Sequence, residues 1–416
     1  MATYNTHTLR NGLRIIHLPD ASPVVYCGYA INAGTRDEQT DEGGLAHFCE
    51  HVTFKGTQRR RAWHILNRLE SVGGDLNAFT TKEDTVYYAA ILKEHLCRAV
   101  DLLSDIVFHS VYPQVELDKE AEVVCDEIES YHDSPSELIF DEFEKMLFAG
   151  HPLGRSILGN AQHLHAYTTA DVLRFTTRHY RPDNMVFFAC GNLSFPRLVR
   201  QLEKSTPATD SPVLPLPNGT HTAGSPMPVL PDYHPHTLCV EKGTHQAHVM
   251  IGNRAYHAYD ERRMPLYLLN NILGGPGMNA RLNLALRERH GLVYSVESSM
   301  VSYSDTGLWA VYFGCDSHDV NRCLRLIRRE LDRFINNDLS TTQLAAAKKQ
   351  LKGQLGVACD NRESFALDFG KSFLHRGWER DVNRLFRRID AVGVSDIRKA
   401  ACELFPQDRL TTLIFQ

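Results

Sequence analysis

A proline-rich segment near the middle of the chain constrains the fold more than any other feature of the sequence. Eight of the 18 prolines fall between residues 205 and 235, among Ser, Thr and Gly residues. Proline lacks a backbone N–H and restricts φ, so such a segment favours an extended connection over a helix or a paired strand. We therefore predict three parts in the 416 residues: an N-terminal domain (1–204), a linker (205–235) and a C-terminal domain (236–416).

The two halves show the same order of secondary-structure signals. In the first half, periodicity predicts strands at 24–32, 76–80, 85–92 and 185–190, with helices at 44–55, 62–72, 95–109, 114–131 and 169–179. In the second half it predicts strands at 245–252, 307–313 and 410–415, with helices at 263–273, 319–336, 341–360 and 395–404. The matching order predicts an α+β fold of two related sheet-plus-helix domains from an internal duplication, with helices on one face of each sheet.

The overall composition excludes several classes of function. The chain is 43% hydrophobic with a net charge of −5, which leaves no electrostatic basis for binding nucleic acid or an anionic membrane. Its ten cysteines form no CxxC pair, and its first residues lack the basic and apolar regions of a secretory signal. No apolar run approaches the ~20 residues of a membrane span. These features predict a cytoplasmic protein.

The clearest chemical motif is His47-Phe-Cys-Glu50-His51, an HxxEH pattern. On a helix, His47 and His51 leave the same face one turn apart, so two imidazole nitrogens can bind one zinc ion. Glu50 faces the same side and is placed to hold a water, as in inverted zinc motifs. A solvated polar stripe has the same spacing. However, the rest of this helix is apolar, and unengaged ionisable groups are costly in a buried helix.

A catalytic zinc site needs a third protein ligand, and the acidic segment 118–130 offers several candidates. Glu127 suits the ligand role. Glu120, two helical turns earlier on the same face, suits a carboxylate that accepts a hydrogen bond from an imidazole and sets its tautomer. Spacing alone does not rank Glu127 above the other acids of the segment, which are Glu122, Asp126 and Glu129.

The motif region resembles the pitrilysin, insulin-degrading enzyme and mitochondrial processing peptidase family of zinc metallopeptidases. The matching segments of the first half are 43–57, 73–88, 120–128 and 151–159, and those of the second half are 273–282 and 286–295. The resemblance covers both halves in order and leaves out only the linker.

The resemblance implies a role for each residue at the metal. It makes His47, His51 and Glu127 the ligands of one Zn²⁺ per chain, and Glu50 the general base that activates a water. Glu120 matches a second acidic position that supports the site.

The resemblance also implies how a peptide substrate is held. Asn77, Ala78 and Phe79 resemble the edge strand that pairs with the substrate backbone. Arg287 and Tyr294 match an Arg/Tyr pair that reaches the substrate near the scissile bond.

The second half has no HxxEH motif in its corresponding helix at 263–273. In the family, a chain of this length forms half of a clamshell chamber. The simplest expectation is therefore a homodimer in which Arg287 and Tyr294 face the zinc of the partner.

These observations predict a zinc-dependent endopeptidase that cleaves extended oligopeptides or presequence-like segments. The main alternative is a non-catalytic structural or assembly subunit of the same family, which loss of HxxEH or of the acidic ligand would mark. The sequence does not separate general peptide turnover from maturation of one peptide. Cys49, beside His47 and Glu50, is either a packed small residue or a thiol whose oxidation blocks the site.

Overall fold

The computed structural model describes residues 4–208, 229–376 and 381–416. The chain forms two compact units, and each unit combines three separate stretches of sequence. Unit 1 comprises Met1–Glu129, Arg155–Met227 and Cys359–Arg380, and unit 2 comprises Ser130–Gly154, Pro228–Ala358 and Asp381–Gln416.

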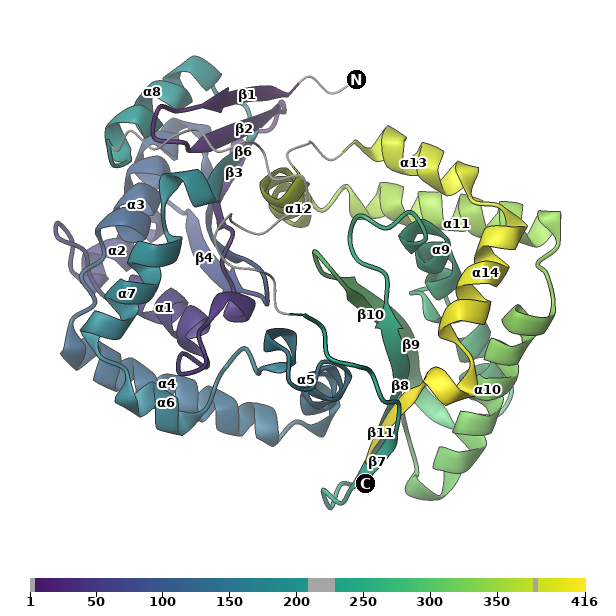
Figure 1. Cartoon of the computed structure of the whole chain (residues 1–416). Coiled ribbons are helices and arrows are strands. Elements are labelled where there is room, and N and C mark those ends of the chain that lie inside the picture. The colour runs from purple at the N-terminus through teal and green to yellow at the C-terminus, as the bar shows by residue number, and fades with distance from the viewer. Residues whose placement is uncertain (1–3, 209–228, 377–380) are drawn as a thin grey trace. The chain divides into compact units, whose positions relative to one another are not determined.

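Unit 1 is built on a six-stranded sheet in the order β1-β2-β6-β3-β5-β4 (Figure 1). Its strands are β1 (Asn5–Thr8), β2 (Arg14–Pro19), β3 (Val24–Ile31), β4 (Asp75–Thr80), β5 (Thr85–Leu92) and β6 (Met185–Gly191). Neighbouring strands are antiparallel except β2 and β6, which run parallel. Within the described residues β4 pairs only with β5, so β4 is an edge strand.

Helices cover one face of this sheet and form the main core of unit 1. They are α1 (Leu45–Thr53), α2 (Ala62–Glu70), α3 (Leu96–His109), α4 (Gln114–His132), α6 (Ala161–Ala166), α7 (Thr169–His179) and α8 (Phe195–Ser205). Tyr29, Tyr87 and Phe187 of the sheet belong to this core, and so does Phe48 of α1, whose ring lies near Tyr167. The buried side of α1 therefore anchors the HxxEH helix on the sheet.

The opposite face of the unit 1 sheet packs against α12 (Arg362–Arg376). Phe369 of α12 lies in one cluster with Phe188 of β6. Gly370 permits this close approach, because a Cβ atom there would lie only 2.5 Å from the Phe188 ring.

Unit 2 is built on a five-stranded sheet in the order β7-β11-β8-β10-β9 (Figure 1). Its strands are β7 (Thr237–Val240), β8 (Ala247–Ala255), β9 (Val293–Ser302), β10 (Gly307–Cys315) and β11 (Thr411–Phe415). One face carries the π-helix η5 (Asn283–Glu288) and helices α9 (Arg263–Gly274), α10 (Val320–Asn336), α11 (Thr341–Ala358), α13 (Val382–Ala391) and α14 (Val394–Leu404). The other face packs against α5 (Pro135–Leu147).

The two sheets share one topology, as the sequence predicts for a duplicated unit. The series β2-β6-β3-β5-β4 corresponds to β7-β11-β8-β10-β9, and in each the first pair is parallel and the others are antiparallel. Helix α1 follows β3 in unit 1, and α9 follows β8 in unit 2. The prediction of two related sheet-plus-helix domains is confirmed. The prediction that helices cover only one face of each sheet is wrong, because α12 and α5 pack on the second faces.

The unit boundaries differ from the contiguous domains predicted from the sequence. Residues 130–154, which include α5, belong to unit 2, and residues 359–380, which include α12, belong to unit 1. Both sheets carry apolar side chains on their second face, and each covers it with a helix from the other half of the sequence. Much of the predicted linker (205–235) lies outside the described residues.

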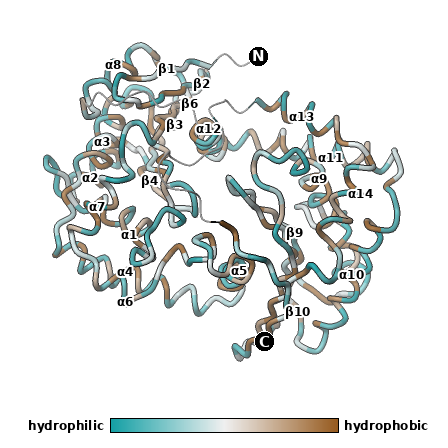
Figure 2. Tube along the Cα trace, in the orientation of Figure 1, coloured by the Kyte–Doolittle hydropathy of each residue, from teal (hydrophilic) through white to brown (hydrophobic). Residues whose placement is uncertain are grey.

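Hydrophobic and hydrophilic residues alternate along the helices, as the colours of their tubes show (Figure 2). No helix in the described parts of the chain is long and apolar enough to cross a membrane.

A buried carboxylate ties the turn between β4 and β5 to α12. Asp84 Oδ2 lies 3.0 Å from Lys371 Nζ, and Asp84 Oδ1 lies 3.4 Å from His375 Nε2. Burial acts to raise the pKa of Asp84, but Lys371 and His375 outweigh it and hold that pKa well below its usual range.

We predict that Asp84→Asn lowers the free energy of unfolding at pH 7 by about 3 kcal/mol, because it leaves Lys371 and His375 without their carboxylate. A depressed pKa stabilises the fold above the unfolded value of about 3.9, and this stabilisation is lost as the pH falls below it. The difference in unfolding free energy between Asp84→Asn and the wild type, measured with urea, should therefore be smaller at pH 3 than at pH 7. The exposed control Asp41→Asn should match the wild type at both pH values, and an equal loss for Asp84→Asn at both would contradict the prediction.

Candidate metal centre

Helix α1 presents the HxxEH side chains from a well-anchored N-terminus. Gly44 precedes the helix at φ 85°, a left-handed conformation that favours glycine. The Glu38 side chain accepts hydrogen bonds from the N–H groups of Gly44 (3.1 Å) and Ala46 (2.9 Å). These bonds satisfy two backbone N–H groups at the start of the helix, which have no acceptor within the helix itself. The first turn and His47 are therefore held in place.

Three side chains converge at one point in unit 1. The ring centroids of His47 and His51 lie 4.6 Å apart, and α4 brings Glu127 next to both. Glu127 Oε2 lies 3.9 Å from His47 Nε2 and 3.6 Å from His51 Nε2. The ligand atoms of all three residues lie within 4.8 Å of one another.

This geometry fits a zinc ion better than direct ion pairing. Bonds of about 2.1 Å in a tetrahedral site place the ligand atoms roughly 3.4 Å apart, close to the separations from Glu127. Those separations are too long for hydrogen bonds. Burial, helped by the nearby His51, lowers the pKa of His47 to about 3, so its imidazole is neutral and can donate a lone pair.

A chain of polar contacts sets the tautomer of His51. Its Nδ1 lies 3.1 Å from Glu120 Oε1, and Lys55 Nζ lies 2.5 Å from Glu120 Oε2. Burial acts to raise the pKa of Glu120, but the contacts with His51 and Lys55 outweigh it and lower that pKa. An ionised Glu120 accepts the Nδ1 proton of His51, which leaves Nε2 free to bind a metal.

Glu50 lies beside the three converging residues and is not one of them. Its carboxylate is largely buried, and Thr80 Oγ1 donates a 2.6 Å hydrogen bond to Glu50 Oε2. Burial raises the pKa of Glu50, against the opposing effects of the Thr80 hydrogen bond and of His51.

Glu127 comes to the histidines because of the buried stripe of α4. Leu117, Ala121 and Val124 face the core and mark this stripe at helical spacing. Glu120 and Glu127 lie along it, whereas the side chain of Glu122 is 72% exposed. Within the described residues, neither Glu122 nor Asp126 nor Glu129 joins the group with the two histidines. The spacing of the apolar residues is therefore a sequence signal that separates these candidates.

Two residues at the site were absent from the sequence prediction. Lys55 stands four residues after His51, the same spacing as between His47 and His51. This spacing is a sequence signal that could have identified it. Thr80 has no such signal, because it reaches Glu50 from a strand 30 residues further along the chain.

Residues Asn77, Ala78 and Phe79 lie on the edge strand β4, where Asn77 is exposed. The Phe79 ring lies near Tyr88 of β5, with centroids 6.3 Å apart.

Cys49 is fully buried, which raises the pKa of its thiol well above the usual value and lowers its reactivity.

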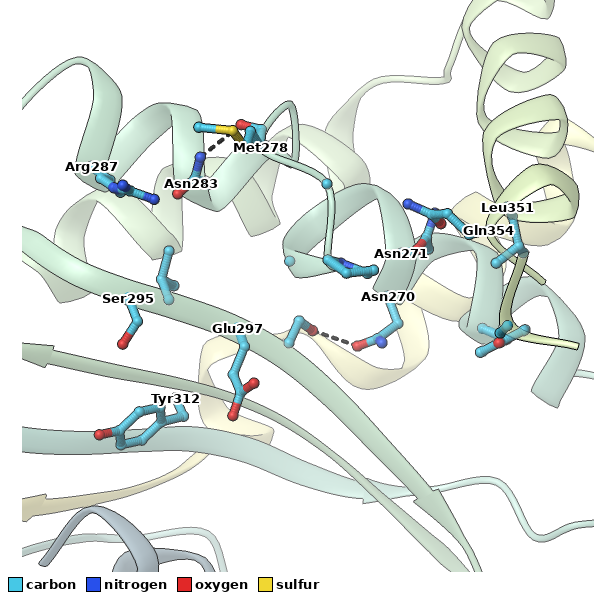
Figure 3. Close-up of a pocket in the computed structure, with 18 of the residues that line it drawn as sticks. Asn270, Asn271, Met278, Asn283, Arg287, Ser295, Glu297, Tyr312, Leu351 and Gln354 are labelled. Atoms are coloured by element: carbon cyan, nitrogen blue, oxygen red, sulfur yellow. Dashed lines mark hydrogen bonds between the residues drawn. The ribbon is translucent and has the colours of Figure 1, made fainter. Parts of the chain in front are cut away.

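Arg287 and Tyr294 lie together in unit 2. Arg287 belongs to the π-helix η5, and Tyr294 belongs to β9 and is 85% exposed. The guanidinium lies 6.0 Å from the Tyr294 ring. Both residues line a cavity of about 760 Å³, in which Arg287 lies on one side and Glu297 of β9 lies on the other (Figure 3).

Comparisons with known proteins agree with this arrangement. Residues 15–161 match the family model described as insulinase (peptidase family M16), and residues 166–351 match the one described as peptidase M16 inactive domain. An uncharacterized zinc protease of Bacillus subtilis is 32% identical over 98% of this chain and 97% of its own length. The chain belongs to peptidase family M16.

Other M16 relatives extend the match. An uncharacterized zinc protease of Streptomyces coelicolor is 34% identical over 96% of this chain and 87% of its own length. The mitochondrial-processing peptidase subunit beta of Saccharomyces cerevisiae is 31% identical over 94% of this chain and 86% of its own. The crystal structure of a protease from Helicobacter pylori shares the fold, with a TM-score of 0.89 at 19% identity and coverage of 100% and 99%.

We predict that Glu120→Ala weakens zinc binding by about 10- to 100-fold, because it removes the acceptor that sets the His51 tautomer. Competition with a chromophoric chelator measures the affinity. The matched control is Glu122→Ala, an exposed acid on the same helix, which should bind zinc like the wild type. Equal affinities for Glu120→Ala and the wild type would contradict this account of the site.

Proposed function

We propose that this M16 chain is a zinc-dependent endopeptidase that hydrolyses extended oligopeptides or presequence-like segments. The observation that carries the proposal is the convergence of His47, His51 and Glu127 beside the carboxylate of Glu50. The zinc protease relatives support the same class of activity.

His47, His51 and Glu127 would hold one zinc ion, which when bound lowers the pKa of a water toward neutrality and polarises a carbonyl. Glu50 accepts the proton of the attacking water and delivers it to the leaving amine. Glu120 keeps the proton of His51 on Nδ1 throughout, so the ring does not turn away from the metal side.

The edge strand β4 suits an extended substrate. On its outer side, β4 pairs with no strand in the described parts of the chain, so its N–H and C=O groups there can pair with a peptide backbone as an added strand. This pairing makes little demand on the side chains of the peptide. Asn77, Ala78 and Phe79 would form this docking edge. A folded protein offers few such strands, so unfolded peptides are the proposed substrates.

Arg287 and Tyr294 would supply donors to the substrate. A guanidinium and a phenol can both donate hydrogen bonds to a developing oxyanion or to a nearby carbonyl. We propose a homodimer in which this pair faces the zinc of the partner chain, so that each active site combines groups from two copies.

A non-catalytic family role is the alternative. The family model described as an inactive domain matches residues 166–351, and helix α9 of unit 2 carries no HxxEH motif. Residues His47, Glu50, His51 and Glu127 are all retained in the other half, which favours the catalytic role.

We predict that Glu50→Gln lowers the rate of peptide hydrolysis by about 10²- to 10⁴-fold, while zinc content and folding stay unchanged. A peptide-library digest read by mass spectrometry, with and without a chelator, measures activity, metal dependence and cleavage preference together. Turnover at the wild-type rate by this variant, or by a chelated wild-type sample, would sink the proposal.

We further predict that Glu50→Gln and Tyr294→Phe subunits, each impaired alone, regain activity when mixed. Random exchange makes half of the dimers mixed, and each mixed dimer has one intact site, so about one quarter of wild-type activity should return. Exchange is verified by mass spectrometry of differently tagged subunits. No recovery despite verified exchange would show that each site is built within one chain.

A further inference from the structure

The hydrogen bond between Thr80 and Glu50 joins the edge strand to the proposed general base. We infer that Thr80 is a positioning residue, which holds the Glu50 carboxylate out of the metal's coordination shell and in line with a peptide on β4. This inference rests on the proposed function and adds to it a residue outside the HxxEH motif.

Thr80 restrains one oxygen of the carboxylate and leaves the other available. Its Oγ1 lies 2.6 Å from Glu50 Oε2, a short, charge-assisted contact. Within the described residues, no other hydrogen bond to the Glu50 side chain is present, so this contact is the one that restrains the rotation of the carboxylate by hydrogen bonding. Oε1 then remains to accept a proton.

Without this restraint, Glu50 has a competing orientation. It precedes His51 on α1, and its carboxylate is near enough to His51 and Glu127 to interact with both electrostatically. A carboxylate released from Thr80 would therefore be free to turn toward the metal position. A fourth protein ligand would occupy the position that a catalytic zinc keeps for water or substrate. The hydroxyl of Thr80 opposes that rotation.

Thr80 is suited to this role because its backbone is held firmly. It is the last residue of β4 and lies opposite Thr85 of β5. In the turn that follows, the N–H of Thr81 donates to the Asp84 carbonyl at 2.8 Å, and the Thr81 hydroxyl donates to the Asp84 carboxylate at 2.9 Å. Lys371 of α12 anchors the same carboxylate.

The same residue links the substrate to the base. A peptide added to β4 takes its register from the N–H and C=O groups of that strand. Thr80 ends the strand and its hydroxyl contacts Glu50. The position of the general base is therefore fixed relative to strand β4. A small displacement of the base relative to the scissile bond is enough to lower the rate strongly.

The test compares Thr80→Val, which removes the hydroxyl at nearly constant shape, with Thr80→Ser, which keeps it. The matched control is Thr85→Val, which removes a hydroxyl that donates to the Ala33 carbonyl at 2.9 Å and does not contact Glu50. We expect Thr80→Val to lower kcat by about 10- to 100-fold with KM and zinc content unchanged. Thr80→Ser should restore most of kcat, and Thr85→Val should change only the unfolding midpoint.

A spectroscopic measurement makes the test independent of activity. Cobalt(II) replaces zinc, and its visible absorption weakens when a four-coordinate site gains a ligand. Thr80→Val should reduce this absorption, and adding Glu50→Gln to that variant should bring it back.

An unchanged cobalt spectrum together with a wild-type kcat for Thr80→Val would overturn the inference. So would a parallel fall of kcat and zinc content that Thr80→Ser does not rescue. If the wild type itself hydrolyses no peptide, the proposed function fails, and the cobalt spectra still decide whether Thr80 restrains Glu50.

Discussion

The placement of α4 beside α1 is the constraint on which the rest of the site depends. It sets His51 against Glu120 and places Glu127 next to the Nε2 atoms of both histidines. Three partly buried ionisable groups are costly to desolvate unless they are engaged. The hydrogen bond of His51 with Glu120, and the contact of Glu120 with Lys55, offset part of that cost before any metal binds. The site is therefore largely organised by the protein itself.

The internal duplication gives the two units corresponding helices, and of these two helices only α1 carries the histidines. Both sheets have the same topology, and α1 and α9 hold corresponding places after β3 and β8. Helix α1 bears the histidines, whereas α9 buries apolar side chains and two asparagines. Unit 2 instead presents Arg287 and Tyr294 at a cavity. The shared fold has thus been given different chemistry in its two copies.

The exchange of α5 and α12 links each unit to the other half of the chain sequence. Helix α12 covers the second face of the unit 1 sheet, and its Lys371 reaches the turn that follows the edge strand. Residues more than 280 positions apart therefore stabilise one hairpin. The proline-rich segment predicts a simple division into two halves, and the apolar second faces of the sheets explain why the fold departs from it.

The sequence by itself determined the features that depend on local geometry. A helix with 3.6 residues per turn places His47, Glu50 and His51 on one side, and the order of strands and helices reveals the duplication. Only the tertiary structure decided that the acidic face of α4 lies beside the histidines, that Lys55 and Thr80 complete the site, and which sheet α5 and α12 cover. These features depend on how helices and strands far apart in the chain pack together. Such packing is set by the combined burial of many side chains, and no spacing within one segment encodes it.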